Sequence, residues 1–157
     1  ATEYFIKKGC RHIAFIGGTK KLFVTQDRYT GYENALKEHQ LELDPQSTAF
    51  VTEFLEEKGY QFTKRLLAKN PNIDAIITTD SLLASGVCDF LSSQNLTIPV
   101  LSFDSVEPKL DLAAYVDINT LELGRVSFQT ILQIINYTKE NRKICYRQLI
   151  SHKIIER

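Results

Sequence analysis

The 157-residue chain has the composition of an ordinary globular domain, with 43% hydrophobic residues, 24% charged residues and a formal net charge of +0. The balanced charge argues against nucleic-acid binding by this segment, because such surfaces carry an excess of lysine and arginine. No apolar run approaches the roughly 20 residues that a membrane-spanning helix needs, and we expect neither a signal peptide nor a membrane partner.

The cysteines give no sign of a metal site. Cys10, Cys88 and Cys145 are far apart, lack the spacing of metal ligands and cannot all pair. We therefore expect reduced thiols in a cytoplasmic protein, with no metal and no cofactor.

The chain opens with "ATEYFIKKG", which is typical of the last turns of a helix closed by a glycine, Gly9. We expect that the sequence was cut from a longer protein.

The next hundred residues alternate short apolar runs with amphipathic segments. Strands are predicted over 12–18, 48–54, 74–79 and 98–104. Helices are predicted over 24–40, 57–70 and 82–94, and Arg28 falls in the first turn of the first of these. This alternation predicts an α/β fold with a Rossmann-like, doubly wound parallel sheet.

The last third departs from the alternation. A short strand or extended crossing is predicted over 113–119, followed by a long helix over 120–141 with a broad apolar face. Two closing strands are predicted over 143–150 and 152–157.

Four side chains are predicted to meet at one edge of the sheet, because ligands of such sheets bind at the carboxyl ends of the strands. Arg28 follows the first strand, Phe54 the second, Asp80 the third and Asp104 the fourth. Carboxylates accept hydrogen bonds from sugar hydroxyls, arginine donates to them, and an aromatic ring stacks on a pyranose. The set suits binding of a neutral polyol.

Each residue also has a plainer interpretation. Arg28 could pair on the surface with Asp27 or Glu33, and Phe54 could belong to the core. Either Asp80 or Ser81 could cap the helix that follows. Asp104 has the weakest plain interpretation, because a carboxylate directly after "VLSF" must be partnered or functional.

Catalytic interpretations find little support. His12, His39 and His152 are scattered, no "GxSxG" nucleophile elbow occurs, and "GGTKK" lacks the spacing of a phosphate-binding loop. We expect a binding protein, not an enzyme.

Six segments, in order, resemble the effector-binding core of the lactose/galactose-repressor (LacI/GalR) family of bacterial transcription regulators. They are "YFIKKGCRHIAFIGG", "RYTGYENAL", "FLEEKGYQFTKRLL", "DAIITTDSLLASGVCDFL", "IPVLSFDS" and "VDINTLELGRVSFQTIL". The resemblance covers almost the whole chain and implies a periplasmic-binding-protein-like (type I) fold of two Rossmann-type lobes.

The resemblance also implies a division of the chain. Residues 11–117 and 144–157 correspond to the C-terminal lobe, and the helical segment 118–143 is expected to dock on an N-terminal lobe that this sequence lacks. The DNA-binding headpiece is absent as well. A homodimer is implied, with part of its interface on the helix over 82–91.

By the same resemblance, Arg28, Phe54 and Asp104 match effector-contacting residues. Asp80 stands where the family usually has asparagine, Ser81 where it usually has the capping aspartate, and Ile118 where many members have glutamine. Asp80 is therefore a less certain contact.

The implied function is sugar sensing by a transcriptional regulator, usually a repressor, in which ligand binding between the lobes changes operator affinity. Maltose or a related glucoside is the favoured effector, and operator DNA is bound through the headpiece. An extracytoplasmic sugar-binding protein of a transport system is the alternative, and a doubly wound phosphotransferase is disfavoured.

Overall fold

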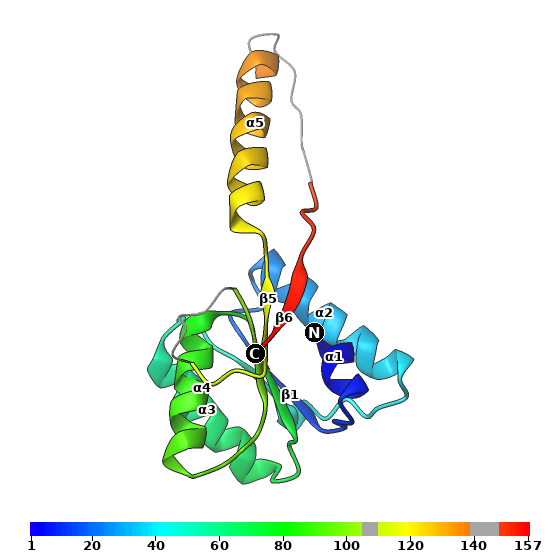
Figure 1. The fold of residues 1–157 in the computed structure, drawn as a ribbon, viewed down its shortest axis with the longest axis vertical. Helices are drawn as coiled ribbons and strands as arrows, with labels where there is room; N and C mark the ends of the chain where they lie inside the picture. The colour runs from blue at the N-terminus through cyan, green and yellow to red at the C-terminus, as the bar shows by residue number, and fades with distance from the viewer. Residues whose placement is uncertain (105–109, 139–147) are drawn as a thin grey trace.

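One mixed sheet organises the protein in a computed structural model that describes residues 1–104, 110–138 and 148–157. The strand order is β2-β1-β3-β4-β5-β6 (Figure 1). The strands are β1 (Ile13–Gly17), β2 (Thr48–Phe50), β3 (Ala75–Thr78), β4 (Val100–Phe103), β5 (Ala114–Asp117) and β6 (Lys153–Glu156). The first five run parallel, and β6 pairs antiparallel with β5.

Helices cover both faces of the parallel part of the sheet. They are α1 (Thr2–Lys7), α2 (Phe23–Glu38), α3 (Glu56–Lys69) and α4 (Ser81–Ser93), with a short 3-10 turn, η1 (Pro45–Ser47), before β2. In β1, Ile13 and Phe15 belong to the core cluster beside α1 and α2, whereas Ala14 and Ile16 belong to the cluster beside α3 and α4. Both faces of the strand are buried, which explains its unbroken apolar run.

The backbones of helices α3 and α4 approach each other closely at two glycines. A Cβ placed on Gly86 would overlap the carbonyl oxygen of Glu56, and one on Gly59 would overlap the carbonyl oxygen of Leu83. Both positions therefore require glycine. This contact fixes the two helices against each other and against the sheet.

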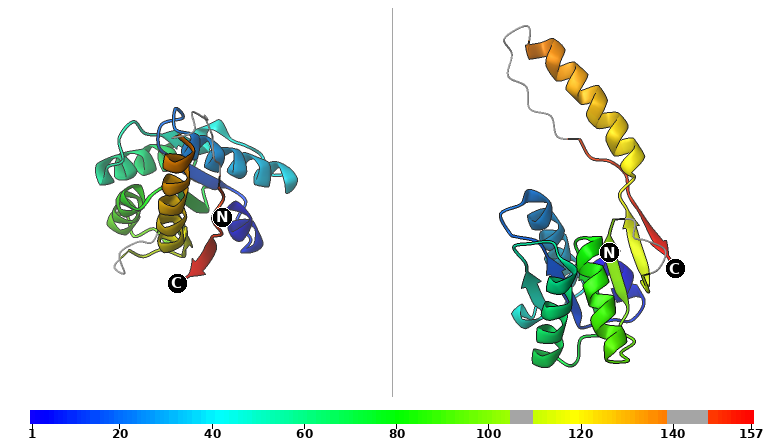
Figure 2. Two further views of the ribbon diagram at one scale, coloured as in Figure 1. Left: turned by 90° about the horizontal axis from the view of Figure 1, so that it is seen from above. Right: turned by 90° about the vertical axis from the view of Figure 1, so that its left-hand side faces the viewer.

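The C-terminal part leaves the body of the domain. Helix α5 (Thr120–Thr138) projects from the end of β5, and the chain returns through residues 148–152 to β6 (Figures 1 and 2). The Thr130 hydroxyl donates to Gln148 Oε1 at 2.8 Å, which holds the returning chain beside the helix. We call α5 with residues 148–152 the projecting arm. Exposed apolar side chains on α5 include Leu121, Leu123, Phe128, Ile131, Leu132, Ile134 and Ile135.

Most predicted elements are confirmed, including the fold class and the helix that ends before Gly9, whose φ is +97°. Strand β2 is shorter than the predicted 48–54 run, because the chain turns toward α3 after Phe50. Helix α2 begins at Phe23, so Arg28 lies in its second turn and the prediction of the first turn was wrong.

The prediction of a strand over 143–150 is wrong for residues 148–150, which are not in a strand, whereas 143–147 lie outside the described residues. The end of the long helix, residues 139–141, also lies outside them. None of the described helices combines the length and apolar content needed to span a bilayer.

Candidate functional site

The carboxyl ends of β1, β3 and β4 bring Arg28, Asp80 and Asp104 together. Arg28 contacts Thr79, which precedes Asp80, and Phe103, which precedes Asp104. Three chain segments that are far apart in sequence thus converge on one edge of the sheet, as the topology predicts.

Arg28 turns inward from α2. Its Nη1 donates to the carbonyl oxygen of Thr79 at 2.5 Å, and its guanidinium carbon lies 4.4 Å from the centroid of the Phe103 ring. Burial lowers the pKa of Arg28, while Asp104 and Asp80 act in the opposite direction. The Thr79 carbonyl oxygen and the Phe103 ring therefore hold the guanidinium at the edge where Asp80 and Asp104 lie.

Asp80 caps α4. Its Oδ1 accepts from the backbone amide of Leu83 at 3.0 Å, and its Oδ2 accepts from the Thr79 hydroxyl at 3.5 Å. Of the two caps that the sequence allowed, Asp80 is the one formed, and Ser81 is the first helical residue. Burial raises the pKa of Asp80 despite the stabilising amides of Leu83 and Leu82.

Asp104 adopts a backbone conformation that favours glycine. Its φ is +84°, and its amide donates to the carbonyl oxygen of Val116 at 3.2 Å. A left-handed conformation costs a non-glycine residue roughly 1–2 kcal/mol. Such strain is typical of functional positions.

Phe54 lies at the same edge but over different neighbours. Its ring covers Gly18, where an added Cβ would overlap it, and it packs against the core cluster of α3 and α4. The amide of Gly18 donates to the Thr79 hydroxyl at 3.2 Å, and Arg28 donates to the Thr79 carbonyl oxygen, so Gly18 and Thr79 lie between Phe54 and Arg28. Phe54 is half-buried and serves the core as well as the edge.

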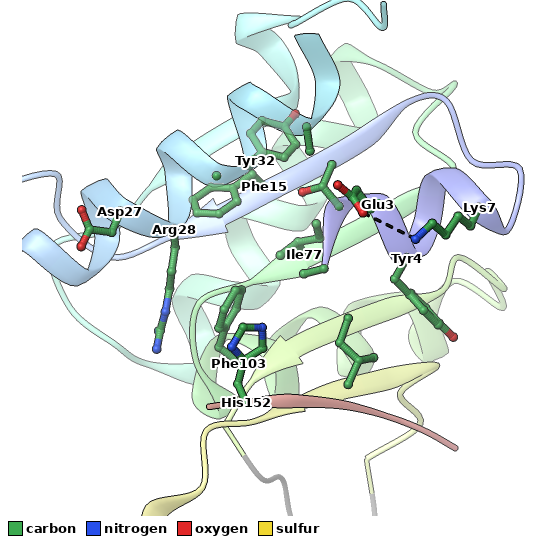
Figure 3. Close-up of a pocket in the computed structure, with 15 residues that line it drawn as sticks. Glu3, Tyr4, Lys7, Phe15, Asp27, Arg28, Tyr32, Ile77, Phe103 and His152 are labelled. Atoms are coloured by element: carbon green, nitrogen blue, oxygen red, sulfur yellow. Dashed lines mark ion pairs between the residues drawn. The ribbon is translucent and has the colours of Figure 1, made fainter. Parts of the chain in front are cut away.

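Three residues of this edge are not predicted by the sequence patterns. Thr79 links Gly18, Arg28 and Asp80 through its hydroxyl and carbonyl groups, and Phe103 underlies Arg28. His152 lines the hollow beside Arg28 that Figure 3 shows, although it lies near the end of the chain. The pairing of β6 with β5 brings His152 to this edge, and no local sequence pattern predicts that pairing.

Beside Arg28 lies a hollow of about 670 Å³ between α1 and α2. Phe15, Ile77 and Phe103 form part of its apolar floor (Figure 3). The edge therefore carries hydrogen-bond donors and acceptors, and an apolar surface lies next to them.

Other chemistries find no support in the described part of the chain. It holds no group of three or more His, Cys, Asp or Glu residues arranged for a metal ion. Cys10 and Cys88 are free thiols, and burial raises the pKa of Cys88 to about 11, which keeps it protonated at neutral pH. Cys145 lies outside the described residues.

The family model of the periplasmic binding protein-like domain matches residues 2–157. Among curated relatives, the HTH-type transcriptional regulator MalR of Streptococcus pneumoniae is 70% identical over 157 residues, which is 100% of this chain and 48% of MalR. The ribose operon repressor of Haemophilus influenzae is 31% identical over 96% of this chain and 46% of its own length.

The solved structure of a LacI transcriptional regulator from Bacillus cereus subsp. cytotoxis superposes on this chain with a TM-score of 0.86 at 28% identity. The match covers 99% of this chain and 56% of that one. The chain thus spans about half the length of the relatives it matches.

Proposed function

Because the chain belongs to the periplasmic binding protein-like domains, and among them to the effector-binding cores of the LacI/GalR regulators, we propose that it senses a sugar for a transcriptional regulator. The observation that carries the proposal is that Arg28 contacts Thr79 and Phe103, the residues directly before Asp80 and Asp104 at the carboxyl edge of the sheet. Ligand binding there changes the affinity of the whole regulator for its operator.

The charges of the edge favour a neutral ligand. An anionic effector would meet two carboxylates and one cation. A polyol instead donates hydroxyl hydrogens to Asp80 and Asp104 and accepts from Arg28, and the Phe54 ring stacks on its apolar face. We expect no metal, no cofactor and no catalysis at this site.

The effector is maltose or a related glucoside. The name of the Streptococcus pneumoniae relative, MalR, at 70% identity supports this choice. The named relatives are a regulator and an operon repressor, which favours the regulator over the alternative of an extracytoplasmic sugar-binding protein. A DNA-bound regulator works in the cytoplasm.

The chain supplies one lobe of the sensor. In this proposal, residues 11–117 and 144–157 form the C-terminal lobe, and the segment 118–143 docks on an N-terminal lobe that closes over the carboxyl edge. The exposed apolar face of α5 supports this docking, because Phe128 is 62% and Ile131 53% exposed. The balanced charge favours operator binding through a separate headpiece. The regulator forms a homodimer, with α4 in its interface.

The test is Arg28→Ala in the full-length regulator. A hydrogen bond to a charged group contributes roughly 1.5–3 kcal/mol, so maltose affinity by calorimetry should fall at least about tenfold. Operator binding in a gel-shift assay should remain, but maltose should no longer alter it.

Arg65→Ala is the matched control. Arg65 also lies over a phenylalanine, 5.3 Å from the Phe62 ring centroid, but on α3 and away from the edge. It should leave affinity and response unchanged. Equal maltose affinity in the wild type and Arg28→Ala would overturn the proposed role of Arg28.

A further inference from the structure

The loop between β1 and α2, which we call the β1–α2 loop, spans residues 18–22 and begins at the carboxyl edge of the sheet. At its start, the amide of Gly18 donates to the Thr79 hydroxyl at 3.2 Å. Near its end, Gln26 Nε2 donates to the carbonyl oxygen of Lys20 at 2.6 Å, which ties the loop to the first turn of α2. Both ends of the loop are thus attached to neighbouring segments.

The side chain of Lys20 gives the loop a third attachment. Its Nζ lies 4.2 Å from the centroid of the Phe50 ring and 4.7 Å from that of the Tyr29 ring. The two rings meet edge to face, with centroids 5.0 Å apart and an angle of 81° between their planes. A cation within about 6 Å of a ring centroid is attracted by the ring. One ammonium group therefore joins the loop to β2 through Phe50 and to α2 through Tyr29.

The core fixes the two rings. Phe15 of β1, which is 1% exposed, lies 5.4 Å from Tyr29 and 6.0 Å from Phe50 between ring centroids. Tyr29 and Phe50 are partly buried and pack against the core cluster that contains Phe15. Lys20, in contrast, is exposed. Loss of its charge is therefore expected to release the loop and not to move the rings.

The β1–α2 loop also contacts two parts of the proposed ligand site. The Phe54 ring covers Gly18 so closely that a Cβ at Gly18 would overlap it. Thr79, whose hydroxyl accepts from the Gly18 amide, accepts from Arg28 through its carbonyl oxygen. A displaced loop would therefore remove the surface that Phe54 covers and a hydrogen bond on Thr79. Lys20 takes part in neither contact, so its effect on a ligand passes through the loop.

We propose that Lys20 is a positioning residue for the ligand site. By binding the Tyr29 and Phe50 rings, it keeps the β1–α2 loop in contact with that site. The inference rests on the proposed function and assigns a part in it to a residue outside the site. The apparent affinity for the ligand then scales with the fraction of molecules in which the loop is in place.

The experiment measures the maltose affinity of the full-length regulator by calorimetry, for the wild type and for Lys20→Met. Methionine keeps most of the apolar length of the lysine side chain but carries no charge. At an exposed site, one contact between a cation and a ring changes an equilibrium by roughly two- to fivefold. Because two rings contact the ammonium group, the maltose affinity of Lys20→Met should fall about fivefold.

Two further variants separate this role from general effects. Lys20→Arg should restore maltose affinity, because a guanidinium also binds ring faces. A side chain that only fills space would not show this dependence on charge. Lys21→Met is the matched control, because Lys21 is the adjacent exposed lysine and both ring contacts belong to Lys20. It should leave maltose affinity unchanged.

A double-mutant cycle with Phe50→Leu tests whether the effect depends on the rings. Lys20→Met should cost less maltose affinity in the Phe50→Leu background than in the wild type, whereas independent residues would show equal costs. Lys20→Met and Lys20→Arg change an exposed residue, so they keep the test valid if Phe50→Leu fails to fold.

The failures are distinguishable. Unchanged maltose affinity in Lys20→Met, or an equal loss in Lys20→Arg or in Lys21→Met, would overturn the positioning role and leave sugar sensing standing. Equal costs of Lys20→Met in the two backgrounds of the cycle would overturn it too. Absence of maltose binding by the wild type would overturn the proposed function, and the positioning role with it.

Discussion

The two edges of the sheet use the same residue type for opposite purposes. At the amino edge, Asp44 accepts from the Gln46 amide at 2.8 Å, the Ser47 hydroxyl at 3.0 Å and Asn70 Nδ2 at 3.0 Å. Asp74 accepts from the amides of Arg11 and His12 at 2.7 and 3.0 Å. These carboxylates join neighbouring loops to one another.

At the carboxyl edge, burial raises the pKa of Asp80, whereas hydrogen bonding, first from the Gln46 amide, lowers the pKa of Asp44. Asp104 is held in a left-handed conformation. The contrast shows that hydrogen-bond donors dominate the environment of Asp44, whereas desolvation dominates that of Asp80, although Asp80 also caps α4.

The largest expected effect is at the amino edge. Asp44→Ala removes three hydrogen bonds, one of which caps the 3-10 turn η1, and should lower the free energy of unfolding by about 2 kcal/mol. Sugar affinity should not change. Urea denaturation measures the first quantity and calorimetry the second. Asp44→Asn keeps an acceptor and should cost less; an equal loss would show that the charge, not the cap, matters.

At the carboxyl edge, Asp104→Asn should lower sugar affinity without changing the free energy of unfolding. It keeps the shape of the side chain but removes the stronger acceptor, so sugar affinity should fall about tenfold, or about 1.4 kcal/mol. Stability should stay the same. Asp80→Asn should weaken binding less, because Asp80 shares its oxygens with Leu83 and Thr79. Tighter binding of a phosphorylated sugar than of the neutral one, in wild type or variant, would contradict this account.

Asp104→Gly separates strain from binding. Glycine adopts a φ of +84° without penalty, so the free energy of unfolding should rise by about 1 kcal/mol while sugar binding is lost. Asn95→Gly is the control, because Asn95 has a φ of +52°, in the region that asparagine tolerates. A stability gain at Asn95 as large as at Asp104 would remove the argument for strain.

The smallest effect is a difference in pH dependence. The lowered pKa of Asp44 contributes stability above pH about 4 that is lost as the pH falls, whereas the raised pKa of Asp80 contributes stability at low pH that is lost as the pH rises through it. Relative to wild type, Asp80→Asn should therefore gain stability as the pH rises from about 4 to about 7, whereas the loss of stability in Asp44→Asn should be constant over that range and shrink as the pH falls below about 4. Urea denaturation that showed no gain for Asp80→Asn, or a loss for Asp44→Asn that grew below pH about 4, would contradict the contrast.

Sequence periodicity predicts the parallel strands, the helices and the edge at which Arg28, Asp80 and Asp104 meet, because each depends on local pattern and strand order. Sequence periodicity cannot predict the neighbouring residues that contact these side chains. Thr79 acts partly through its carbonyl oxygen, which no side-chain pattern encodes. His152 depends on a strand that pairs from the far end of the chain. Asp80 and Ser81 compete for one cap, and the outcome depends on the backbone geometry at the end of β3.

The close contact of α3 and α4 at Gly59 and Gly86 has a mechanical consequence. Because the two backbones are in contact there, we expect these helices not to slide, so that Phe54, which precedes α3, and Asp80, which caps α4, keep a constant separation. In the proposed sensor, rearrangement on binding should then be concentrated where the chain enters and leaves the projecting arm, at residues 118–119 and 148–152. Ligand binding should rotate the rest of the domain as a unit about these two short segments, without changing its internal shape.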